Sequence, residues 1–166
     1  MSVNHSEISS FIWNVCDDVL RGLFKPHEYG DIILPFTVLR RLDCVLEDKK
    51  DEVYNLYHQY KSEVDDPTPI ILNKVKTSFY NYSKYDLNRL RQDPLNVNLN
   101  LQNYLGCYSE NVIEIIENFQ LEKPIEKLDR NNRLFEFIDK FPEINLHPDN
   151  VSNHMMGQIF EELLRR

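Results

Sequence analysis

The chain has 166 residues, of which 42% are hydrophobic and 28% charged, a balance that excludes a disordered polypeptide and suits one soluble domain. Its formal net charge of −8 excludes the usual basic, free-standing binder of duplex DNA, so we expect the chain alone to bind duplex DNA weakly. Its three cysteines are far apart and odd in number, which excludes a disulfide framework. The longest apolar run, residues 32–36, is too short to cross a membrane. A cytoplasmic protein is therefore expected.

The N-terminal part of the chain predicts two helices. From Ile8 to Phe24, apolar residues recur at steps of three and four, which indicates an amphipathic helix with Ser6 as its N-cap and an end at Lys25-Pro26. A second helix is expected to begin at Asp31, which would cap it. Because this helix is apolar over most of its circumference, we expect it to lie at the centre of the fold.

The remaining segments are predicted with less uniform signals. A helix over residues 53–60 either continues the second helix or follows a break near Lys50, and residues 65–69 are expected to form a loop. Residues 70–72 fit helix or strand, and residues 77–85 are expected to be irregular or extended. Apolar residues alternate over 95–101, which by period indicates a strand, but we favour a helix because no second clear strand is available to pair with it.

The last third of the chain predicts further helices, over residues 110–119, 123–129 and 132–141, and a last one that starts near Asn150 or Ser152. The low glycine content argues against turn-rich all-β folds. The sequence therefore predicts an all-α fold, a compact multi-helix domain of about six to eight helices with up to one short β element.

The sequence lacks the motifs of an independent enzyme. Gly22, Gly30, Gly106 and Gly157 are isolated, so no glycine-rich phosphate loop is present, and the five histidines lack metal-ligand spacing. Cys16 lies in an apolar stripe, where a small core residue is a better interpretation than a nucleophile. We therefore predict no catalytic, cofactor-binding or metal-binding residue in this chain.

Five basic residues are candidates for contact with DNA or with another subunit. Two interpretations stay open for Arg40 and Arg41, which lie within the apolar second helix: pairing with Asp43 or another carboxylate, or contact with a DNA phosphate or a subunit. The other three lie beside a tyrosine cluster, a combination that some nucleic-acid contacts use, although such tyrosines more often pack with a polar tip exposed. These three are Lys84, Arg89 and Arg91.

Two segments resemble the N-terminal helical domain of the modification (methyltransferase) subunit of type I restriction–modification systems. In that family a tyrosine-led turn precedes a long helix with a Leu-Pro pair and, further on, a basic residue followed by leucine. The residues that fit are Tyr29, Leu34, Pro35, Leu39, Arg41, Leu42 and Asp43. The second segment, residues 153–166, is similar to the helix that joins this domain to the catalytic domain, with matches at Gly157, Ile159, Phe160, Glu161 and Leu163.

The resemblance implies a parent protein that transfers a methyl group from S-adenosylmethionine to adenine N6 at specific sites in duplex DNA. It also implies partners: a second methyltransferase subunit, a specificity subunit and, in some systems, a restriction subunit. The family's donor site and its Asn-Pro-Pro-Phe-type motif have no counterpart here, so residues 1–166 are expected to be the N-terminal helical domain without the catalytic domain. Such a domain would be inactive alone, and would help to assemble the subunits and close around DNA.

The interdomain joining surface is expected on the last helix, at Gly157, Ile159, Phe160 and Leu163, because its apolar stripe runs to the last residues without a C-cap signal. The alternative function from another class is a generic helical adaptor, a protein–protein interaction domain unrelated to DNA.

Overall fold

The all-α prediction is confirmed by a computed structural model that describes residues 4–165; Arg166, the last residue of the joining segment, lies outside them. Within this range the chain forms helices and only two isolated β-bridges. The α-helices are α1 (His5–Leu20), α2 (Gly30–Leu46), α3 (Lys50–Tyr60), α4 (Thr68–Val75), α5 (Val97–Gly106), α6 (Glu110–Phe119), α7 (Glu122–Arg130), α8 (Leu134–Asp139) and α9 (Asn153–Leu164). Short 3-10 turns are η1 (Pro26–Glu28), η2 (Glu47–Lys49), η3 (Arg89–Gln92) and η4 (Pro94–Asn96).

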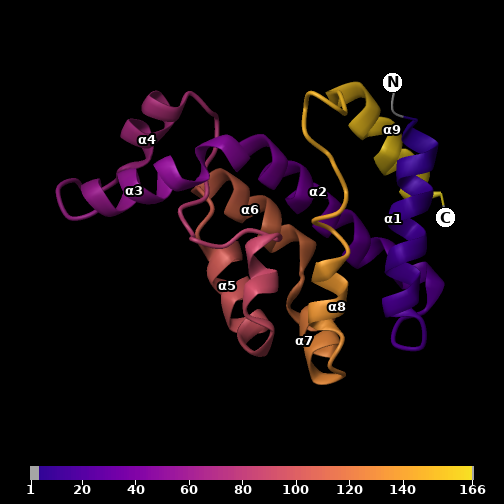
Figure 1. Ribbon diagram of the computed structural model, residues 1–166. Helices are drawn as coiled ribbons and strands as arrows, with labels where there is room; N and C mark the ends of the chain where they lie inside the picture. The colour runs from indigo at the N-terminus through magenta and orange to yellow at the C-terminus, as the bar shows by residue number, and fades with distance from the viewer. Residues whose placement is uncertain (1–3, 166) are drawn as a thin grey trace.

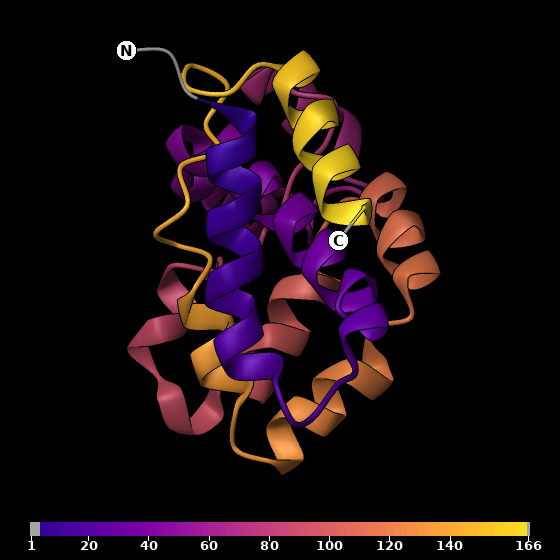
Figure 2. The same ribbon diagram turned by 90° about the vertical axis from the view of Figure 1, so that its right-hand side faces the viewer.

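The long helix α2 runs through the middle of the molecule (Figure 1). Helices α1 and α9, from opposite ends of the chain, pack side by side at one end of α2 (Figures 1 and 2). Helices α3 and α4 pack together at its other end, and α5 to α8 lie below α2 in Figure 1. The central position expected for the second helix is thus confirmed: Ile32, Ile33, Phe36 and Leu39 are fully buried.

Helix α1 begins and ends earlier than its apolar pattern predicts. Asn4, not Ser6, is the N-cap, because its Oδ1 accepts a hydrogen bond from the Ser6 amide at 2.8 Å. The helix ends at Leu20 because Gly22 adopts φ +86°, a left-handed conformation open to glycine. Leu23 and Phe24 still pack against the core from the turn that follows, which explains why the apolar spacing continues past the helix end.

Helix α2 begins one residue before the predicted start, and its cap is not Asp31. Tyr29 occupies the N-cap position, and its hydroxyl donates to Asp17 Oδ1 of α1 at 2.6 Å, which ties the two helices together. Pro35 lies within the helix, where its missing N–H removes one hydrogen bond near the N-terminal end. The helix ends at Leu46, and η2 separates it from α3, so the break near Lys50 is the correct alternative.

The segment with alternating apolar residues forms η4 and helix α5, as favoured. Val97 and Leu101, four residues apart, are buried, whereas Leu95 is 97% and Leu99 70% exposed. The period-two pattern therefore combines one buried helical face with two exposed leucines.

Residues 70–72, left open between helix and strand, belong to α4. Helices α3 and α4 share a small second core, which is formed by Val53, Ile71, Val75 and Tyr80.

Candidate nucleic-acid interface

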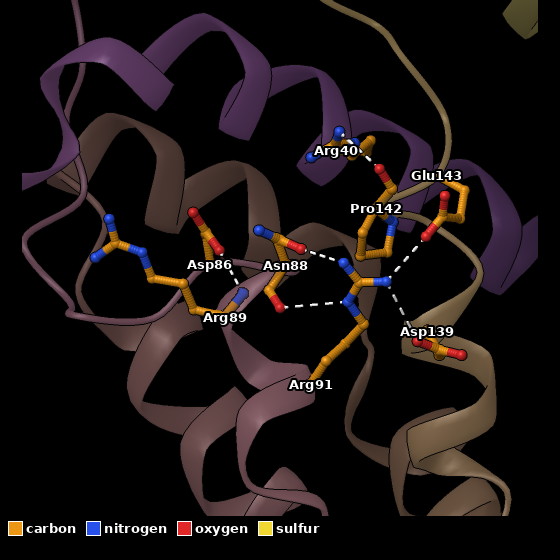
Figure 3. Close-up of polar contacts among 8 residues, drawn as sticks. All are labelled: Arg40, Asp86, Asn88, Arg89, Arg91, Asp139, Pro142 and Glu143. Atoms are coloured by element: carbon orange, nitrogen blue, oxygen red, sulfur yellow. Dashed lines mark hydrogen bonds and ion pairs between the residues drawn. The ribbon is translucent and has the colours of Figure 1, made fainter.

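Arg40 and Arg41 hold the chain segment that leads into α9. Arg40 donates from Nε to the Ile144 carbonyl at 2.8 Å. It also donates from Nη2 to the Pro142 carbonyl at 3.0 Å (Figure 3). Arg41 donates to the carbonyls of Leu146 and Val151, and also to Asn153 Oδ1. Four of these five acceptors are backbone carbonyls and the fifth is an amide oxygen. Within residues 4–165 neither arginine forms an ion pair, so the interpretation of pairing with Asp43 or another carboxylate is wrong.

We expect Arg41→Lys to lower the free energy of unfolding by about 1–2 kcal/mol, because a compact ammonium cannot reproduce the fork that reaches three acceptors. Urea unfolding of the two proteins measures this loss. Arg21→Lys is the control, since Arg21, at the C-cap of α1, forms an exposed ion pair with Asp17, and its replacement should change stability little. Equal effects of the two substitutions would contradict the structural role of Arg41.

Arg89 and Arg91 are engaged by acidic residues. Arg89 pairs with Asp51 at 3.1 Å, and its backbone amide donates to Asp86 Oδ1. Arg91 pairs with Glu143 at 3.0 Å and approaches Asp139 at 3.6 Å, as Figure 3 shows. Such exposed pairs are weak and exchange readily with other anions, so both side chains stay candidates for a phosphate contact.

Lys84 differs from the other four candidates. Its side chain is exposed, and within residues 4–165 its ammonium contacts no carboxylate. The ammonium lies over the ring of Tyr85, with Nζ 5.3 Å from the ring centroid. Of the five predicted basic residues, Lys84 is therefore the one whose charge is not committed to a protein acceptor in the described chain.

A cleft opens beside Lys84, with a volume of about 460 Å³. Three parts of the chain line it: α3, the irregular segment 82–85, and α5 with its C-cap. We call it the tyrosine cleft, and its lining residues are Tyr54, His58, Tyr82, Ser83, Lys84, Tyr85, Leu99, Asn100, Asn103 and Cys107. The sequence had indicated Lys84 and a tyrosine cluster beside it, which supplies Tyr82 and Tyr85 here. It did not indicate the α3 and α5 residues, since nothing local in the sequence shows that these helices meet the segment.

Asn81 anchors the start of the segment that carries Lys84. Its Oδ1 accepts from Lys50 Nζ at 2.9 Å and from the Ser83 amide at 2.8 Å, while its Nδ2 donates to the Tyr104 carbonyl at 2.9 Å. All of these groups are buried. Because one amide side chain joins α3, the segment and α5, it fixes the three walls of the tyrosine cleft relative to one another.

Asp43 anchors the other end of the segment. Its Oδ2 accepts from the Leu87 amide at 2.8 Å, and its Oδ1 accepts from the Tyr104 and Tyr108 hydroxyls, which lie 2.7 Å apart. Burial, followed by the nearby charge of Asp86, raises the pKa of the Asp43 carboxyl to about 7. Burial also lowers the pKa of Lys50 to about 8. The sequence had indicated Asp43 as a partner of Arg40 or Arg41 and as a match to the family pattern, but not as the acceptor for these groups.

The residues expected to join this domain to another are placed partly inside the fold. Ile159 and Leu163 are buried where α9 packs against α1, so they are not a free joining surface in this structure. Phe160 is partly buried, Gly157 is exposed, and the neighbouring Leu164 is 68% exposed. The apolar stripe of α9 is therefore used within the domain, because α1 offers it a complementary face.

Other chemistry finds little support in the described range. Across residues 4–165 no group of three histidine, cysteine or acidic side chains is arranged to hold a metal ion. Burial raises the pKa of the thiols of Cys16, Cys44 and Cys107, which disfavours their reactive thiolate forms. None of the helices described here has the length and apolar character needed to span a bilayer.

Comparison with known proteins adds one finding. A family model described as the HsdM N-terminal domain matches residues 8–141. No curated protein and no solved structure matches the chain.

Proposed function

The chain belongs to the HsdM N-terminal domain family, the N-terminal domain of type I restriction–modification modification subunits, and from this premise we propose that it serves site-specific DNA methylation without catalysing it. The observation that carries the proposal is the match over residues 8–141, which takes in the core from α1 to α8. No comparison supports the alternative, a generic helical adaptor.

The methyl donor of the proposed reaction is S-adenosylmethionine and the acceptor is adenine N6 in DNA. The described residues do not fit a donor site: within residues 4–165 no strand forms, and Gly30, Gly106 and Gly157 lie apart, each within a different helix. We therefore assign donor binding and methyl transfer to a catalytic domain of the modification subunit, with α9 as the helix that leads toward it.

The role that we propose for this domain is to help assemble the subunits and to contact DNA within the assembly. The net charge of −8 disfavours strong duplex binding by the chain alone, so its DNA contacts would be local and supported by partner subunits. Lys84, with its uncommitted charge, is the first candidate for such a contact, and Arg89 and Arg91 lie on the same stretch of chain. The partners are a second modification subunit, a specificity subunit and, where one is encoded, a restriction subunit.

The test measures transfer of radiolabelled methyl groups from S-adenosylmethionine to unmethylated DNA. We expect no label with residues 1–166 alone, and labelled adenine when this domain is joined to the catalytic domain of the modification subunit and combined with the specificity subunit. DNA that already carries the modification is the control and should take no label. Label transferred by residues 1–166 alone, or equal transfer by a modification subunit that lacks them, would contradict the proposal.

A further inference from the structure

The tyrosine cleft has flat aromatic surfaces already in place. Tyr82 is stacked in parallel on Tyr57, with ring centroids 3.6 Å apart and an interplanar angle of 8°. Tyr54 and His58 follow one another on a turn of α3, with centroids 4.3 Å apart. Planar rings held by packing offer stacking surfaces to a planar aromatic ligand at little cost in conformational entropy.

The charge of the cleft is opposite to that of the whole chain. Although the chain carries 27 acidic residues and a net charge of −8, none of the residues that line the cleft is acidic. Lys84 lies at the cleft with its charge uncommitted. An anionic group carried by an aromatic ligand would therefore meet a cation in the cleft and no carboxylate from its lining.

Two asparagines add polar groups at the α5 wall. Asn103 accepts from the Ser83 hydroxyl at 2.6 Å through Oδ1, and no hydrogen bond of its Nδ2 lies within the described chain. Asn100 donates through Nδ2 to Asp93 at 3.3 Å, which leaves its Oδ1 as an acceptor. A donor and an acceptor on one wall can meet the edge of a nucleobase, whose edges present both kinds of group.

We propose that the tyrosine cleft binds an unstacked DNA base, with a flanking phosphate on Lys84; the choice of DNA rests on the proposed function. A volume of about 460 Å³ lies within the range of small-molecule pockets and gives room for one base. A paired base in a duplex shows only its edges, so stacking on these rings requires a base that has left the helix. Binding such a base would offset part of the free energy of opening the duplex.

The experiment measures fluorescence anisotropy of dye-labelled DNA with the 166-residue chain at low salt. Three probes are compared: a single-stranded oligonucleotide, the same strand with abasic sites in place of its bases, and the corresponding duplex. We expect the single strand to bind about tenfold more tightly than the abasic strand, because base–aromatic stacking is what the abasic strand lacks. We also expect tighter binding of the single strand than of the duplex.

Two substitutions separate stacking from charge. Tyr54→Ala removes a ring that is 36% exposed and should weaken single-strand binding about tenfold while leaving the salt dependence unchanged. Lys84→Ala should weaken binding to every probe and lower the slope of log affinity against log salt by about 0.7 on the single strand. Lys74→Ala, at an exposed lysine of α4 outside the cleft, is the control for simple loss of charge and should change neither quantity.

Circular dichroism melting confirms that each variant is folded, and Tyr54→Phe, which keeps the ring, should bind as the parent chain does. Equal affinity for abasic and ordinary single strands, or unchanged binding by Tyr54→Ala, would overturn the inference. This result is separable from the methylation test. Failure of methylation with intact, base-dependent binding would remove the proposed function alone, whereas successful methylation without base-dependent binding would remove the cleft proposal alone.

Discussion

Replacing Asp43 with alanine is expected to lower the free energy of unfolding by about 3 kcal/mol, because buried donors would lose their acceptor. The Leu87 amide donates to Asp43 Oδ2 at 2.8 Å, and the Tyr104 hydroxyl donates to Oδ1. Without the carboxyl, the Leu87 amide would be buried without a partner, and Lys50 would lose a nearby counter-charge. Urea unfolding followed by circular dichroism measures the loss.

The pH dependence of stability identifies the contribution of the Asp43 charge. The folded pKa of about 7 lies above the ordinary value of 3.8, so between these pH values the folded chain binds more protons than the unfolded chain. The stability contributed by this group is therefore present below about pH 4 and is lost as pH rises toward 7. Lys50 acts at higher pH: its lowered pKa of about 8 makes its contribution rise as pH increases from 8 toward 10.5.

Asp43→Asn is the matched variant for this prediction. It keeps one oxygen acceptor for Tyr104 but cannot ionise, so its stability relative to the parent chain should improve steadily from pH 4 to pH 7. Two stability curves that run parallel across this window would show that the Asp43 carboxyl does not titrate as its burial requires.

Ile159→Ala is expected to lower the free energy of unfolding by about 3 kcal/mol, because it opens a cavity between α9 and α1. Leu164→Ala is the control on the same helix, since Leu164 is 68% exposed and should change stability by less than about 0.5 kcal/mol. The two variants are compared by their midpoints of urea unfolding, provided that the dependence of the free energy of unfolding on urea concentration is unchanged. If the two substitutions cost the same, α9 would be an appendage of the domain and not part of its core.

Local sequence signals were sufficient to predict most of the helices, whereas α4 stayed open between helix and strand. The spacing of apolar residues predicted α1, α2, α6 and α9, and the argument against a lone strand predicted α5 against its period-two pattern. The helix boundaries were less predictable, because the position of a cap depends on the local backbone geometry. Asn4, not Ser6, caps α1. Tyr29 occupies the N-cap position of α2, where its ring is buried beside α1. In both cases the backbone conformation decides which residue occupies the N-cap position, and the residue types alone do not determine that conformation.

The candidate site was only partly predictable, for a different reason. The segment of Lys84 and its tyrosines could be identified because its residues are adjacent in sequence. The partners of Arg41 lie more than 100 positions away, and the walls of the tyrosine cleft come from three separate segments. The burial of Ile159 likewise depends on α1. These long-range contacts depend on which helices pack against each other. An amphipathic stripe predicts that one face of a helix is buried, but it does not identify the element that covers that face.

The packing of the first helix on the last has a consequence for synthesis. Ser9 and Ile159, which meet across α1 and α9, are separated by 150 positions, so one of the main interfaces of the domain is the one most distant in sequence. Contacts of such high contact order form slowly, because the intervening chain must close first. While the ribosome is still making the middle of the chain, the apolar face of α1 lacks its final cover, and a nascent chain in that state is exposed to aggregation and is a substrate for chaperones.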